Sequence, residues 1–154
     1  MGKSPIMIKF PSTDYFEALK TRMAAEQERF RRLGFIDATF AVKVSGNGRP
    51  RNFVLEFEVF ELKNVREVDT VDLKQVDFAI EGEAGVWREM IENIKRHGEA
   101  DTNHDINTLT HFGEQLKVTY DGPDGHDKLY RFMESIQEFF DLSSGIDVSF
   151  NQAG

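Results

Sequence analysis

The stretch VDFAIEGEAGVW, residues 76–87, decides the fold class because its hydrophobic period changes part-way along. Apolar residues alternate from Val76 to Ile80, which is typical of a strand with one buried face. Gly82 and Gly85 close this strand. From Val86 to Arg96 the apolar residues fall within one arc at helical spacing, which predicts a helix. A strand that leads directly into an amphipathic helix indicates a sheet with a helix packed on it.

The preceding sequence predicts a helix followed by a hairpin. Apolar residues from Asp14 to Leu33 recur at spacings of three, four and seven, and Gly34 ends this helix. Strands are predicted at Ile36–Val44 and Phe53–Val59, with Gly46-Asn47-Gly48 as the turn between them. The following segment, Phe60–Asp72, fits a third strand only with a bulge or turn.

The sequence after the second helix is acidic before it becomes apolar again. The stretch Glu99–Asp127 carries seven acids against a single lysine and includes a short helical turn and a strand at Leu116–Tyr120. A third helix follows the turn at 121–125. Its apolar face consists of Leu129, Phe132, Met133, Ile136, Phe139 and Phe140. We expect one domain with its core at about 12–142 and a flexible C-terminal tail at 143–154.

The composition of the chain argues against several classes of partner and location. The chain has 154 residues, 40% of them hydrophobic, a formal net charge of -8 and no cysteine. The acidic balance argues against nucleic acid and anionic membranes as partners. No apolar run approaches the ~20 residues of a membrane span, so we expect no integral membrane association. Met1–Phe10 is too short and interrupted for a signal peptide, and we expect a cytoplasmic protein.

The order of elements predicts an α+β fold, with an antiparallel sheet covered on one face by helices. Three features carry a resemblance to a known family: the N-terminal helix that ends in a glycine, the hairpin, and VDFAIEGEAGVW. A fourth is FGEQLKVTYDGPDGHDKLYRFMESI, residues 112–136, a strand followed by the C-terminal helix. Over about Asp14–Ser144 the chain resembles the sterol carrier protein type two (SCP-2) family. The resemblance implies a five-stranded, mainly antiparallel sheet and helices that enclose an apolar tunnel.

The resemblance also implies non-covalent binding or transfer of an apolar small molecule, such as a sterol, a fatty acid or a fatty acyl chain. We therefore expect no cofactor, no metal and no catalytic residue. An empty cavity of ~300 Å³ would cost about 7 kcal/mol, so such a tunnel should collapse, hold water at polar spots or stay occupied. The predicted ligand-binding residues are the apolar side chains of the second and third helices and of the turn between them: Trp87, Met90, Ile94, Leu109, Phe112, Leu129, Phe132, Met133, Ile136 and Phe140.

Two other classes of function stay open. A small lyase or isomerase with a cone-shaped pocket would need titratable side chains that converge inside, and His111 with Asp37 or Asp77 is the candidate pair. A ligand-free interaction subunit would keep a filled core and pair through an exposed apolar patch, as in a homodimer.

Metal sites and a docking loop are the remaining candidates. His97, His104 and His111 are spaced seven apart, so a folded loop would be needed to bring them to one metal ion. The aspartates at 121, 124 and 127 resemble a calcium loop but lack its late bidentate glutamate. The acidic loop Glu99–Asp105 is a candidate surface for a partner.

Overall fold

The computed structural model describes residues 7–46 and 48–150. Three parts of the chain lie outside the described residues: 1–6, 47 and 151–154. They include part of the segment assessed as a signal peptide, one residue of the predicted turn and the end of the predicted tail. In chain order the elements are β1 (Ile8–Phe10), α1 (Thr13–Ala25), α2 (Gln27–Arg31), β2 (Ala38–Ser45), β3 (Arg51–Glu58), β4 (Glu61–Val68), β5 (Phe78–Glu83), α3 (Ala84–His97), α4 (Ile106–His111), β6 (Leu116–Thr119), α5 (Pro123–Arg131), α6 (Met133–Asp141), a 3-10 turn at Leu142–Gly145 and β7 (Val148–Phe150).

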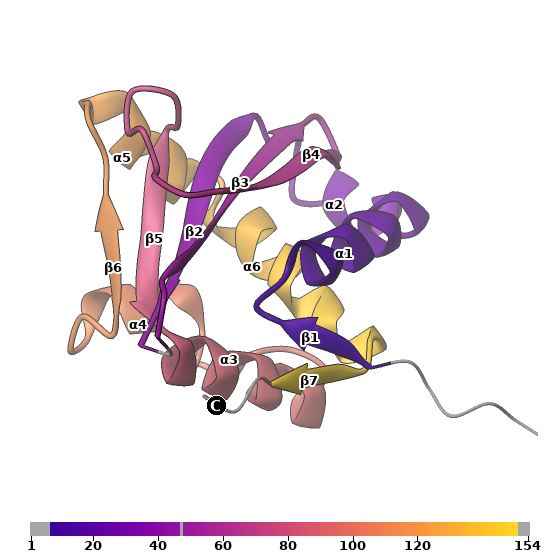
Figure 1. The fold of residues 1–154 in the computed structure, drawn as a ribbon. Helices are drawn as coiled ribbons and strands as arrows, with labels where there is room; N and C mark the ends of the chain where they lie inside the picture. Colours follow the sequence, from indigo (N-terminus) through magenta and orange to yellow (C-terminus); the bar gives the residue numbers. More distant parts are fainter. Residues whose placement is uncertain (1–6, 47, 151–154) are drawn as a thin grey trace, which may run out of the picture.

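Five strands form the main sheet, in the order β4-β3-β2-β5-β6. All neighbours in this sheet are antiparallel except β2 and β5, which run parallel. Figure 1 shows the strands on one side of the molecule, α1 and α6 on the other, and α3 across the end at which β5 finishes. The predicted α+β class and the five-stranded, mainly antiparallel sheet are therefore confirmed.

Alternation along the strands separates the two faces of the sheet. Phe40, Phe57 and Phe78 point to the helical side, where their rings stack in one layer with centroids 5.5 and 4.9 Å apart. Ala41 and Ala79 point to the other side, where the segment between β4 and β5 packs against them. The helices therefore bury the large side chains on one face, and small side chains suffice on the other.

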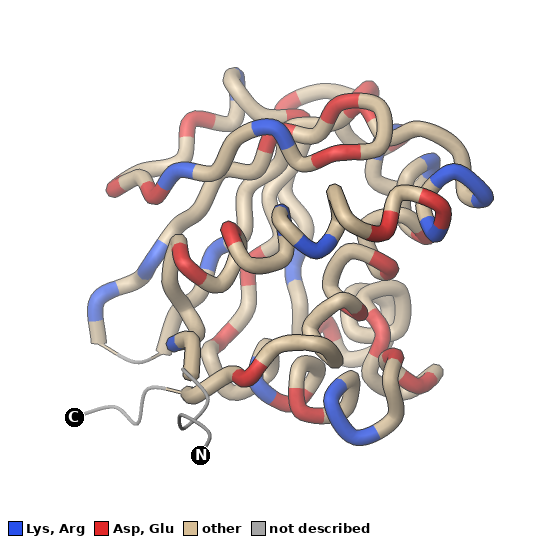
Figure 2. Tube along the Cα trace, turned by 90° about the vertical axis from the view of Figure 1, so that its right-hand side faces the viewer, with Lys and Arg blue, Asp and Glu red and all other residues tan. Residues whose placement is uncertain are grey.

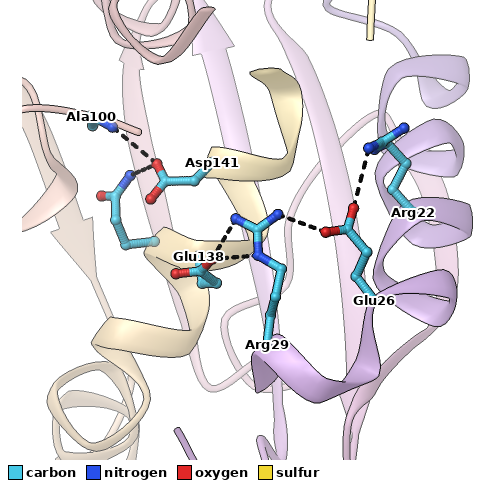
Figure 3. A network of polar contacts seen from close by, with 7 residues as sticks. Arg22, Glu26, Arg29, Ala100, Glu138 and Asp141 are labelled. Atoms are coloured by element: carbon cyan, nitrogen blue, oxygen red, sulfur yellow. Dashed lines mark hydrogen bonds and ion pairs between the residues drawn. The ribbon is translucent and has the colours of Figure 1, made fainter. Parts of the chain in front are cut away.

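Two of the predicted helices are each divided by a break that the apolar spacing does not reveal. The first ends at Ala25, because Glu26 leaves helical geometry with φ -124° and ψ 41°. Figure 3 shows ion pairs at this break: Glu26 contacts Arg22 and Arg29, and Arg29 also contacts Glu138 on α6. The third predicted helix is divided at Phe132, at φ -107° and ψ 12°.

The tail predicted to begin at residue 143 is packed as far as Phe150. Ser143 is fully buried, and its hydroxyl oxygen lies 2.6 Å from that of Tyr15 on α1. Strand β7 pairs in parallel with β1, and Val148 lies opposite Ile8. Neither three-residue strand is evident in the sequence, because each depends on a partner at the opposite end of the chain.

Candidate functional site: a mouth between α4, β6 and α5

The interior of the molecule contains most of the residues predicted to bind a ligand. Buried members of this set are Trp87, Met90, Ile94, Leu109, Leu129, Phe132, Ile136 and Phe140. They belong to one continuous apolar cluster between the sheet and the helices, with the half-buried Met133 packed against it. Trp87 of α3 lies against Phe140 of α6, with ring centroids 5.7 Å apart. Phe112 lies outside this cluster and is 71% exposed.

Two glycines allow the elements around this cluster to approach closely. A Cβ at Gly82 of β5 would lie 2.5 Å from a methyl group of Leu116 on β6. A Cβ at Gly125 of α5 would lie 1.8 Å from the carbonyl oxygen of Asp77. The atom near Gly125 belongs to the backbone, so the position of α5 requires glycine there, whereas the methyl group near Gly82 ends a flexible side chain that can shift.

A hollow of about 230 Å³ opens between α4, β6 and α5, and we call it the mouth. Its floor is apolar and consists of Leu116 and Val118 of β6 with Leu129 of α5. All three side chains either belong to the buried apolar cluster or pack against it. The floor of the mouth is therefore the outer surface of the core, with no polar layer between them.

The rim of the mouth is polar and aromatic. It includes His111 at the end of α4, Tyr120 after β6, and His126 and Tyr130 on α5. His111 Nε2 lies 2.7 Å from the hydroxyl oxygen of Tyr130. The His126 ring lies between the two tyrosine rings, with centroids 5.3 Å from Tyr120 and 4.7 Å from Tyr130.

The acid–base pairs considered for His111 are not formed. Asp77 accepts a hydrogen bond from the backbone N–H of Thr39 at 2.8 Å and lies near Lys128. Asp37 is exposed. Among the residues described, His111 is hydrogen bonded to two side chains, those of its neighbour Thr110 and of Tyr130. Neither is a carboxylate.

The candidate metal ligands do not converge either. His104 Nδ1 lies 2.7 Å from Asp101, and the carboxylate of Asp101 also accepts a hydrogen bond from Asn93. These hydrogen bonds, led by that of His104, lower the pKa of Asp101 to about 2. Over residues 7–46 and 48–150, no three His, Cys, Asp or Glu side chains are grouped as a metal ion would require. Nor does any helix in the same ranges have the length and apolar character of a membrane span.

Comparison with solved structures identifies the architecture. A conserved hypothetical protein from Thermus thermophilus, described as a possible sterol carrier protein, matches with a TM-score of 0.70 and 14% identity, over 99% of this chain and 100% of that one. A crystal structure of sterol carrier protein 2 matches with a TM-score of 0.65 and 13% identity, over 88% of this chain and 97% of that one. The chain has an SCP-2-like fold.

No protein-family model and no curated protein sequence matches the chain. At 13–14% identity the likeness concerns the SCP-2-like fold alone, and the predicted resemblance is confirmed at that level.

Of the rim residues, the sequence singles out only His111, as a candidate for an acid–base pair or a metal site, and does not point to Tyr120, His126 or Tyr130. His126 and Tyr130 are four positions apart on α5, so they share a helix face, and this spacing is visible in the sequence. Their approach to His111 and Tyr120 depends on the packing of α5 against β6 and could not be read from local spacing.

Proposed function

We propose that this protein binds the apolar chain of a small amphipathic molecule without transforming it, as the name sterol carrier protein suggests for its structural neighbours. The chain would enter through the mouth and lie between the sheet and α5 and α6, against the predicted residues Leu129, Met133 and Ile136. The polar end of the ligand would stay at the rim.

One observation carries the proposal, namely that the floor of the mouth is continuous with the apolar core. A ligand that displaces the side chains of the floor would meet only apolar atoms beneath them. Burial of each CH₂ group contributes about 0.8 kcal/mol before ordering costs. A long alkyl chain could therefore offset the cost of moving side chains apart.

The rim argues against the lyase or isomerase alternative. Such an enzyme would need titratable groups whose pKa is tuned by burial inside a pocket. His111 and Tyr130 meet at the exposed edge of the mouth instead, and Tyr130 is 45% exposed. The geometry therefore favours binding.

Calorimetric titration with three amphiphiles of equal chain length, dodecylammonium chloride, sodium dodecanoate and dodecan-1-ol, tests the proposal below micellar concentrations. We expect at least one to bind with a stoichiometry of one and to raise Tm. A ligand at about a hundred times its Kd adds about 2.7 kcal/mol to the free energy of unfolding, which raises Tm by about 5–10 °C. Binding of none of the three would refute the proposal and would favour a ligand-free interaction subunit.

A variant at the floor locates the binding site. Val118→Trp places a large ring in the mouth, and we expect it to weaken binding more than about tenfold. Thr119→Trp is the matched control, because neighbouring residues of a strand point to opposite faces. Equal losses for the two variants, with Tm values showing both folded, would place the ligand elsewhere.

A further inference from the structure

Three hollows adjoin at the rim of the mouth and share its aromatic residues. Tyr130 lines both the mouth and a second hollow of about 400 Å³ beside α4 and α6. Tyr120 and His126 line both the mouth and a third hollow of about 380 Å³ at the start of α5. A polar group of a ligand beside these shared residues would therefore lie next to all three hollows.

The hydrogen bonds of His111 determine what Tyr130 offers to that group. His111 Nδ1 lies 2.7 Å from the carbonyl oxygen of Asn107, which can only accept, so Nδ1 carries the proton. In the neutral ring Nε2 is then an acceptor, and the hydroxyl of Tyr130 donates to it across 2.7 Å. Because this contact uses the only proton of Tyr130, its oxygen presents lone pairs to a ligand. That arrangement suits a hydrogen-bond donor.

The rings at the rim suit a positive charge. Tyr120 and Tyr130 are 43% and 45% exposed, and each packs against His126 with tilted planes. The face of a tyrosine ring attracts an ammonium group within about 6 Å of its centre. An uncharged or negative group would not gain this attraction.

The charges around the three hollows also favour a positively charged ligand. Five carboxylates line them, against the single ammonium group of Lys117: Asp105, Glu114, Asp121, Asp127 and Glu134. In the described part of the chain, none of the five forms an ion pair with a lysine or arginine. On the side of the molecule seen in Figure 2, by contrast, basic and acidic positions are interleaved. Arg22 of α1, for example, forms an ion pair with Glu26.

We propose that the mouth selects a cationic amphiphile, an organic ammonium group on an apolar chain, over a carboxylate or phosphate. The inference rests on the proposed function and adds the chemistry of the polar end. The ammonium group would lie at the rim beside Tyr130, donate to the oxygen of Tyr130 and be attracted by the surrounding carboxylates. The alkyl chain would pass over Val118 into the core.

The same three amphiphiles test the proposal, compared at about 20 mM and about 500 mM salt. At low salt we expect dodecylammonium to bind on the order of tenfold more tightly than dodecanoate, with dodecan-1-ol between them. The ratio should shrink at high salt because the carboxylates are exposed. Dodecanoate binding as tightly as dodecylammonium at low salt would overturn this inference and leave the proposed function standing. Binding of no probe would overturn both.

Variants distinguish the effect of the residues at the mouth on affinity from the effect of the chain's net charge. Glu114→Gln removes one carboxylate of the mouth, and Tyr130→Phe removes the acceptor oxygen. We expect each to lower the affinity for dodecylammonium about two- to threefold. Glu114→Gln should change the affinity for dodecan-1-ol little, because the alcohol is uncharged. Glu28→Gln on α2 is the control, because its 90% exposed side chain lines none of these hollows. An equal loss for Glu28→Gln would mean that overall charge sets the preference, which contradicts a site at the mouth.

Discussion

Asp141, on the last turn of α6, is a buried carboxylate whose ionisation should destabilise the native protein. Its side chain accepts hydrogen bonds from the backbone N–H of Ala100 at 3.2 Å and from Gln137 at 3.0 Å (Figure 3). Burial, with a smaller contribution from the carboxylates of Glu138 and Glu99, raises the pKa of Asp141 to about 6 against the lowering effect of these two bonds.

The direction of the pH effect on stability follows from the pKa of Asp141 in the unfolded chain and in the folded protein. Between the ordinary value of 3.8 and about 6, the folded protein holds a proton on Asp141 that the unfolded chain has lost. The free energy of unfolding therefore falls as pH rises through this window and stays lower above it. At ~1.36 kcal/mol per pKa unit, the upper limit of the loss is about 3 kcal/mol.

Asp141→Asn should remove this pH dependence while keeping the local contacts. Both hydrogen bonds end on the same carboxylate oxygen, which an asparagine retains. At pH 4 we expect variant and wild type to have similar stabilities. At pH 7.5 the variant should be more stable by about 1–3 kcal/mol.

Denaturant unfolding of both proteins from pH 4 to pH 8 measures the difference directly, since the other titrating groups cancel. Glu28→Gln, at an exposed position, should change the free energy of unfolding by less than about 0.5 kcal/mol throughout. A difference between Asp141→Asn and wild type that does not vary with pH would refute the reasoning, as would a less stable variant at pH 7.5.

Two further predictions concern close packing. Gly125→Ala brings a methyl group against the carbonyl of Asp77, so we expect the free energy of unfolding, measured by thermal unfolding, to fall by about 1–3 kcal/mol. Gly85→Ala is the control and should be neutral or stabilising, because nothing lies within 4 Å of the added atom. Equal effects of the two variants would argue against a steric cause. Tyr15→Phe should cost about 1–2 kcal/mol because it leaves the buried hydroxyl of Ser143 without its partner. The double variant with Ser143→Ala should cost less than the sum of the single changes, and strict additivity would contradict coupling through this bond.

The sequence predicts those parts of the fold that depend on local periodicity. Alternation at Ile36–Val44 and Phe53–Val59 predicts the hairpin of β2 and β3, because one face of each strand is buried along its whole length. The apolar stripes of the predicted helices also identify residues that the helices bury, such as Trp87 and Phe140. The breaks at Glu26 and Phe132 could not be predicted, since neither position holds the Gly or Pro that usually marks one.

The sequence predicts residues of the candidate site only in its apolar part, and their role in binding a ligand stays a prediction. Leu129 and Met133 were expected to bind a ligand from their spacing, and the structure places them at the mouth and the adjoining hollow. The rim depends on tertiary contacts, such as that between His111 and Tyr130, for which the sequence offers only unpaired candidates. Phe112 follows the last residue of α4 with an extended backbone, and its side chain turns to solvent.

The pairing of β1 with β7 bears on how the protein folds during synthesis. Ile8 leaves the ribosome long before its partner Val148 is synthesised. Until then β1 has an open hydrogen-bonding edge, and Phe10 lacks the neighbouring ring of Phe150. A nascent chain of this protein can assemble its main sheet before β7 exists, but β1 can pair with β7 only after that distant segment has been synthesised.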